Sequence, residues 1–135
     1  MTAASTAVLD ASVLVRSVIE PRSGGAEWVA AVDQGSVQGH TATLAFTGVA
    51  NALLGYVRAD ALSLADATAA LNALAGLPLR LHGPELAPAA LAAAIDLGLS
   101  AYDGTFAALA ESLDAPLVTA DRRLAAAVPS AELLN

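Results

Sequence analysis

Three aspartates in this sequence stand where a carboxylate could do chemistry. Asp10 interrupts the apolar run 8–15, Asp121 follows the short apolar segment 116–119, and Asp103 falls in the first turn of an expected helix. Removing a carboxylate from water is costly unless a partner compensates it. A metal ion would be such a partner for Asp10, whereas backbone N–H groups of the following helix would make it a simple N-cap. The segment around Asp10 alone supports both interpretations.

The composition excludes several classes of chemistry. The chain has 135 residues, a formal net charge of −7 and no cysteine, and its six basic residues are all arginines. Without lysine there is no Schiff-base or P-loop chemistry. Without cysteine there is no thiolate nucleophile, disulfide or zinc ribbon. The two histidines, His40 and His82, are too few for a histidine-rich metal site, and we expect them at strand ends rather than as ligands.

The length and the hydropathy pattern indicate a single domain, residues 1–135, that stays out of membranes. Residues 34–57 carry no formal charge, but their apolar part falls short of the ~20 residues that a membrane helix requires. No basic residue precedes the first apolar segment, which argues against a secretory signal. We therefore expect a cytoplasmic protein, and the lack of cysteine is compatible with a reducing compartment.

Short apolar strands alternate with longer amphipathic helices along the chain. The expected strands are 7–9, a weak one around Val37, 77–81, 116–119 and an edge strand within 128–134; the expected helices are 12–19, 26–33, 41 or 43 to 59, 63–76, 88–97, one from Ser100 and a short one after 120. This alternation predicts an α/β fold, a three-layer α/β/α sandwich with a mostly parallel sheet. In such sheets functional groups gather at the carboxyl ends of the strands, where we expect the three aspartates to converge.

Three segments, 8–12, 99–103 and 117–124, resemble in order and spacing the motifs of PIN-domain ribonucleases, most closely the VapC-like toxins of bacterial type II toxin–antitoxin pairs. The resemblance implies a PIN-like fold and an endoribonuclease whose acidic cluster holds Mg²⁺ or Mn²⁺ and cleaves RNA. Asp10, Asp103 and Asp121 match three of the family's acidic positions. The resemblance also implies a cognate antitoxin, whose C-terminal segment would lie across the site, and a homodimer.

Elementary metal chemistry suggests roles for these acids. Hard divalent cations prefer oxygen ligands, and Mg²⁺ often takes only one or two carboxylates while keeping several waters. Asp10 and Asp103 would then be the metal ligands, and Asp121 would hold a metal-bound water or a second ion. Ser12 and Thr119 could orient the carboxylates by hydrogen bonds, although each could equally be a cap or turn residue.

Two arginines are the candidates for binding nucleic acid. Affinity for a phosphate backbone comes mostly from Lys and Arg, so an acidic protein must hold RNA through a local contact. Arg122 and Arg123 directly follow Asp121 and could reach a phosphate there. At least one of them could instead be a solvated residue in the first turn of a helix.

The sequence departs from the family pattern at one acidic position. The pattern has a glutamate before apolar-Ala-Asn-Ala-Leu, but Gly48 precedes the matching segment 49–53, and no carboxylate lies between Asp33 and Asp60. An inactivating change, a natural degenerate homologue and a working three-carboxylate site are three explanations, of which we slightly favour the first. If the missing acid limits the site, Gly48→Glu should raise both metal affinity and ribonuclease activity.

Two rival functions remain to be weighed. A response-regulator receiver domain also clusters aspartates at strand ends, but it needs a lysine near its last strand and this chain has none. A catalytically inactive PIN-fold module that binds an antitoxin or another partner protein is the stronger alternative. Mn²⁺-dependent cleavage of RNA would separate that module from an active ribonuclease.

Overall fold

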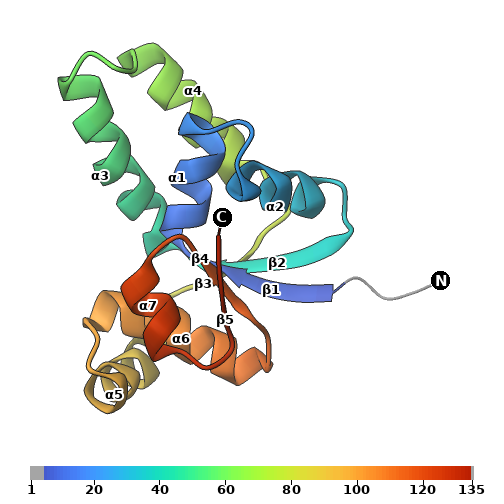
Figure 1. Ribbon diagram of the computed structural model, residues 1–135, viewed down its shortest axis with the longest axis vertical. Coiled ribbons are helices and arrows are strands. Elements are labelled where there is room, and N and C mark those ends of the chain that lie inside the picture. Colours follow the sequence, from blue (N-terminus) through green and yellow to red (C-terminus); the bar gives the residue numbers. More distant parts are fainter. Residues whose placement is uncertain (1–4, 135) are drawn as a thin grey trace.

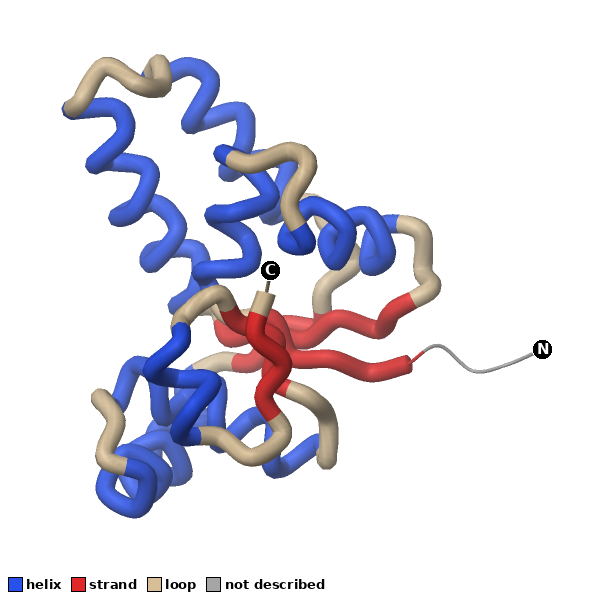
Figure 2. Tube along the Cα trace, in the orientation of Figure 1, coloured by secondary structure: helices blue, strands red, loops and turns tan. Residues whose placement is uncertain are grey.

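The computed structural model describes residues 5–134 and places one sheet between two layers of helices (Figure 1, Figure 2). The sheet has five strands in the order β3-β2-β1-β4-β5, and every neighbouring pair is parallel. This architecture confirms the predicted α/β/α sandwich. The strands are β1 (Ser5–Leu9), β2 (Val37–Ala42), β3 (Arg80–His82), β4 (Leu117–Thr119) and β5 (Ala131–Leu133).

The helices that join these strands cover both faces of the sheet. Four of them, α1 to α4, lie on one side, where α3 and α4 extend beyond the sheet, while α5 and α6 lie on the other side (Figure 1). Within residues 5–134, none of the helices has the length and apolar character needed to cross a bilayer. Their bounds are α1 (Ala11–Ile19), α2 (Gly24–Asp33), α3 (Leu44–Arg58), α4 (Leu64–Ala75), the 3₁₀ turn η1 (Pro84–Leu86), α5 (Ala87–Leu97), α6 (Ala101–Leu113) and α7 (Arg122–Ala127).

The central strands carry the core. Val8 and Leu9 of β1 and Leu117 and Val118 of β4 are completely buried. Strands of a parallel sheet covered on both faces are expected to be continuously apolar, as these are. Phe106 of α6 is the largest side chain in this core. Burying each such side chain stabilises the fold by roughly 1.5–3 kcal/mol, so the strand ends that carry the aspartates rest on a rigid base.

Two strand boundaries differ from the predicted ones. β2 continues through Thr41 to Ala42, because the Thr41 hydroxyl donates to the carbonyl oxygen of Leu9 at 2.6 Å and the backbone pairs with β3. The third strand begins at Arg80 instead of residue 77. Pro78 has no backbone N–H to donate to a ladder, so regular pairing starts only after it.

The strand order reverses between β1 and β4. From β1 the chain adds β2 and then β3 on one side, and it later adds β4 and β5 on the other side. In open parallel sheets the crevice used for function lies at such a reversal, outside the carboxyl ends of the two strands. Asp10 directly follows β1 and Asp121 follows β4 by two residues, so the chain brings both acids to this point.

Candidate active site at the carboxyl ends of β1 and β4

Asp10 is a buried carboxylate held from two sides. Its side chain is only 5% exposed. The Ser12 hydroxyl donates to Oδ1 at 2.5 Å, and the Thr119 hydroxyl donates to Oδ2 at 2.6 Å. The backbone N–H of Val13 also donates to Oδ1, at 3.3 Å, so Asp10 caps α1 as well. Capping and a role in the site, set out as alternatives from the sequence, are therefore compatible.

The two hydroxyl groups have little freedom to point elsewhere. Ser12 Oγ accepts the backbone N–H of Ala120 at 2.8 Å, and Thr119 Oγ1 accepts that of Asp121 at 3.0 Å. Each hydroxyl has one proton, and accepting from the backbone orients that proton toward Asp10. The expected orienting role of both residues is thus present. These bonds also tie the turn after β4 to the start of α1.

Burial disfavours the charged form of the Asp10 carboxyl. Desolvation raises the pKa of its carboxyl above the ordinary value of 3.8, and the hydrogen bonds from Ser12, Thr119 and Val13 oppose that rise. Within residues 5–134 the only ion pair joins Arg16 and Glu20, so no arginine of that range neutralises Asp10. A buried acid without a counter-charge is the kind of group that a bound cation would stabilise.

Asp103 lies at the beginning of α6, which Ser100 caps. The Ser100 hydroxyl accepts the backbone N–H of Asp103 at 3.1 Å. Burial raises the pKa of the Asp103 carboxyl, and the charge of Asp121 raises it further, whereas Ser100 and the nearby Arg123 lower it. Asp103 in α6 and Asp121 at the start of α7 are thus close enough for their charges to interact.

Asp121 is exposed and caps the last helix. Its Oδ1 accepts the backbone N–H groups of Arg123 at 2.9 Å and Leu124 at 3.2 Å. With Gly48, it also lines an open cleft of about 380 Å³ beside α1 and α3. Asp121 therefore has a structural role in α7 and a second oxygen available toward this cleft.

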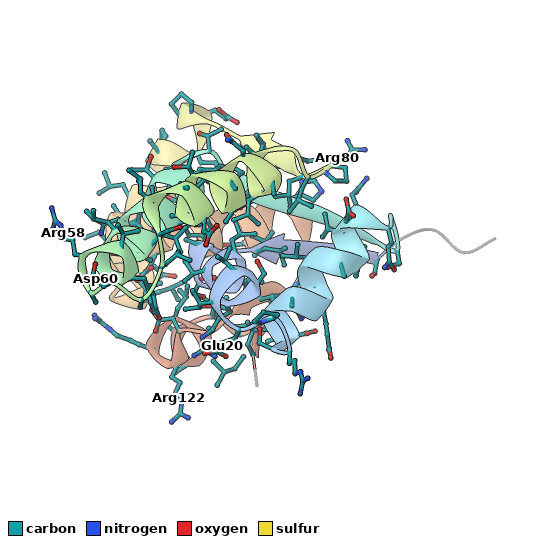
Figure 3. The ribbon with its side chains drawn as sticks, turned by 90° about the horizontal axis from the view of Figure 1, so that it is seen from above. Glu20, Arg58, Asp60, Arg80 and Arg122 are labelled. Carbon is teal, nitrogen blue, oxygen red and sulfur yellow. The ribbon has the colours of Figure 1, made fainter. Side chains whose placement is uncertain are left out.

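The two candidate arginines differ in their position relative to the acids. Arg123 is close enough to lower the pKa of the Asp103 carboxyl, which places its positive charge near the acids. Arg122 projects away from the body of the protein into solvent (Figure 3). Both side chains are exposed. Of the two, Arg123 has the better position for contacting a phosphate at the site.

Tyr102 belongs to this neighbourhood, although sequence reasoning missed it. Its pKa is raised above the ordinary value of 10.0 by burial, then by the charge of Asp10 and then by that of Asp103. The phenol is therefore close to both acids and keeps its proton at neutral pH. Its position directly before Asp103 was the one signal in the sequence, but nothing there indicated on which side of α6 it lies.

The donor set suits a hard cation in part. All three candidate ligands are carboxylates, and the best placed, Asp10, is buried without a counter-charge. Within residues 5–134, however, no three carboxylates or histidines come close enough to hold one ion together. A cation here would take one or two carboxylates and complete its shell with water, as Mg²⁺ commonly does.

Comparisons with known proteins agree with this fold. A family model described as PIN domain matches residues 7–128. The chain belongs to the PIN domain family. The resemblance seen in its three motifs is thereby confirmed at the level of the family. No curated protein matches the chain.

Solved structures share the PIN fold of this chain over nearly its whole length. The crystal structure of PAE2754 from Pyrobaculum aerophilum has a TM-score of 0.75 and 26% identity, with 96% of this chain and 90% of that chain covered. VapBC2 from Rickettsia felis, bound to a DNA fragment from its promoter, has a TM-score of 0.65 and 12% identity, with coverage of 96% and 99%. A toxin–antitoxin complex from Klebsiella pneumoniae has a TM-score of 0.62 and 16% identity, with coverage of 93% and 95%.

Proposed function

We propose that this PIN domain is a Mg²⁺- or Mn²⁺-dependent endoribonuclease and the toxin of a type II toxin–antitoxin pair in the cytoplasm. Family membership supports nuclease chemistry in general. Two of the similar structures are toxin–antitoxin assemblies by their titles, which supports the toxin class. The proposed partners are an RNA substrate, a cognate antitoxin and a second copy of the chain in a homodimer.

The observation that supports the proposal is the buried position of Asp10 and the two hydroxyl groups that bind its carboxylate. Ser12 and Thr119 fix both oxygens of a carboxylate that is buried without a counter-charge at the reversal point of the sheet. Keeping an acid there lowers the stability of the fold, because burial penalises its charged form. Such an arrangement is typical of a functional site rather than of a structural one.

The acids and the hydroxyl groups of the site would have different roles in metal binding and hydrolysis. Asp10 and Asp103 would hold the ion, which would lower the pKa of a bound water and neutralise charge on the phosphate. Ser12 and Thr119 keep the Asp10 carboxylate in one orientation, so that binding an ion requires little rearrangement. Asp121 would orient water at the cleft.

Arg123 would contact the substrate. Its charge lies near Asp103, so it could bind a phosphate oxygen of the RNA without a long basic surface. Arg122 would contribute only through a more distant part of the substrate backbone.

The proposal is tested by RNA cleavage with purified protein in Mn²⁺, Mg²⁺ and EDTA. We expect cleavage that depends on the metal, and Asp10→Asn should reduce it at least about a hundredfold. Asp33→Asn is the matched control, because Asp33 is an exposed aspartate at the end of α2, away from the site. Equal cleavage by Asp10→Asn and the wild type would contradict the assignment.

One alternative has an observation in its favour. No three acidic groups share one ion position within residues 5–134, and Gly48 adds no acid. Both features fit a catalytically inactive module that binds an antitoxin. Such a module would form its dimer and remain folded, yet it would cleave no RNA at any Mn²⁺ concentration. Metal-dependent cleavage by the wild type would therefore reject it.

A further inference from the structure

The Tyr102 hydroxyl is lodged against the backbone of α3 at Gly48. A Cβ built on Gly48 would collide with the phenol oxygen, would lie 3.2 Å from the ring carbon Cζ and would lie 3.3 Å from the Cβ of Ala11. Tyr102, Gly48 and Ala11 belong to α6, α3 and α1 respectively. The phenol therefore fills the volume where any side chain at position 48 would begin.

Space, and not backbone conformation, accounts for the glycine at position 48. The described glycines with a positive φ are Gly35 and Gly98, so Gly48 has an ordinary helical backbone that alanine could adopt. Glycine is disfavoured in a helix interior relative to alanine. Gly55, in the same helix, offers a contrast, because a Cβ there would meet no atom within 4 Å.

The ring of Tyr102 is supported by the core, although the residue is partly exposed. It packs edge-on against Phe106, with ring centroids 5.5 Å apart and planes at 64°. The side chain remains 41% exposed, so a substrate can reach it. Since Phe106 is completely buried, the ring rests on a fixed part of the core.

We propose that Tyr102 is a further catalytic residue of the proposed ribonuclease: its hydroxyl, for which Gly48 leaves room, joins the three aspartates and donates a hydrogen bond to the reacting phosphate. This inference rests on the proposed function. A phenol suits that role because it adds a donor without adding negative charge. A phosphate approaching Asp10 and Asp103 would be repelled by a fourth carboxylate but bound by a neutral donor.

The structure changes the expectation for Gly48→Glu. From the sequence, a glutamate at this position would simply complete the acidic cluster. In the structure it would compete with the Tyr102 hydroxyl for one volume, so the tyrosine would have to swing out. The glutamate should therefore be accommodated far better when Tyr102 is also replaced by alanine.

Thermal unfolding tests the packing by placing Gly48→Ala and Gly55→Ala each in the wild type and in Tyr102→Ala. Gly55→Ala should raise Tm equally in the wild type and in Tyr102→Ala, because it only improves helix propensity. Gly48→Ala should raise Tm by a similar amount in Tyr102→Ala, but should raise it less, or lower it, when Tyr102 is present. If Gly48→Ala and Gly55→Ala raise Tm equally in the wild type, Tyr102 does not occupy that volume and the inference fails.

RNA cleavage by Tyr102→Phe tests the chemistry, because only the hydroxyl is lost. We expect kcat to fall about ten- to a hundredfold with little change in KM, as for loss of a hydrogen bond to a charged group in the transition state. The Tm increase caused by Mn²⁺ should stay as in the wild type, because the phenol acts on the phosphate. Asp33→Asn, at an exposed position at the end of α2 away from the site, is the control and should keep full activity.

The outcomes separate this inference from the function on which it rests. If the wild type cleaves RNA with Mn²⁺ and Tyr102→Phe keeps its kcat, the role of Tyr102 is wrong and the ribonuclease stands. If the wild type cleaves no RNA with any divalent metal, the proposed function is wrong, and the catalytic role falls with it. A lower kcat accompanied by an equal loss of the Mn²⁺-dependent Tm increase would show a structural effect and would also reject the inference.

Discussion

Two places in the same sheet bury an ionisable side chain, and they do so in different ways. At the β1/β4 end, Asp10 is 5% exposed and receives hydrogen bonds from two hydroxyl groups. At the β2/β3 end, His40 is 6% exposed, and its Nδ1 lies 2.9 Å from Nε2 of His82 on the neighbouring strand. Both groups pay for burial, since desolvation disfavours their charged forms.

The two buried groups differ in whether the protein itself compensates the cost of burying their charge. Burial lowers the pKa of His40, and the charges of His82 and Arg80 lower it further, so the ring is neutral at pH 7. One neutral imidazole accepts the N–H of the other, which completes the pair. Burial raises the pKa of Asp10, and its neighbours supply hydroxyl groups but no positive charge. The comparison teaches that only the Asp10 site is built to need a partner from outside the chain.

The largest expected effect is stabilisation by Mn²⁺ through Asp10. A ligand at a hundred times its Kd stabilises the folded state by about 2.7 kcal/mol, which a melting experiment detects easily. Asp10→Asn should remove most of this gain. His40→Gln should retain it, because the histidine pair is complete without a metal. An equal gain in Asp10→Asn and the wild type would place the metal elsewhere and break the comparison.

The second effect concerns the hydroxyl that supports Asp10. Thr119→Val keeps the side-chain shape but removes the donor to Asp10 Oδ2 and the acceptor for the backbone N–H of Asp121. Leaving buried polar groups unpaired should lower the free energy of unfolding by about 2–3 kcal/mol in urea denaturation. Thr68→Val, at an exposed position of α4, should change it by no more than about 0.5 kcal/mol.

A third prediction follows from the raised pKa of Asp10 in the metal-free protein. The folded state holds this proton more tightly than the unfolded state, so the contribution of Asp10 to stability falls as pH rises from 3.8 through the raised pKa. Asparagine does not titrate. Asp10→Asn should therefore gain stability relative to the wild type over that range and keep a constant advantage above it. A difference that shrinks as pH rises would show that Asp10 is stabilised as an anion.

The smallest expected effect is the pH dependence of the histidine pair. Because the folded-state pKa of His40 lies below the ordinary value of 6.5, its contribution to stability is full above pH 6.5 and is lost as pH falls through the lowered value. His40→Gln should flatten the melting temperature over this range. A wild-type curve that is already flat between pH 5 and 7 would mean that the pair tolerates a second proton.

The sequence predicted those parts of the site that depend on short-range signals. A lone acid in an apolar run, followed by Ser12, indicated a strand end with a supported carboxylate, and the segment ending in Asp121 indicated a second one. Alternating strands and helices were enough for the three-layer architecture. These signals are local, because strand burial and helix caps depend on residues only a few positions apart.

The contacts that the sequence did not predict join residues far apart in the chain. Gly48 and Tyr102 are separated by two helices and a strand, and only the tertiary packing of α3 and α6 brings them together. The His40 and His82 pair depends on the pairing of β2 with β3, which the sequence did not predict, and the expected start of β3 was three residues too early. Neither helical periodicity nor residue type specifies such long-range distances.

The hydrogen bond between Asp10 and Thr119 also determines when, during synthesis on the ribosome, the site can form. During synthesis Asp10 leaves the ribosome first, and its second hydroxyl partner, Thr119, follows 109 residues later. At roughly 5–20 residues per second, several seconds pass between the two. During that interval the nascent chain carries the acid without β4, the strand that orients it. A site arranged in this way cannot form until β4 has been synthesised.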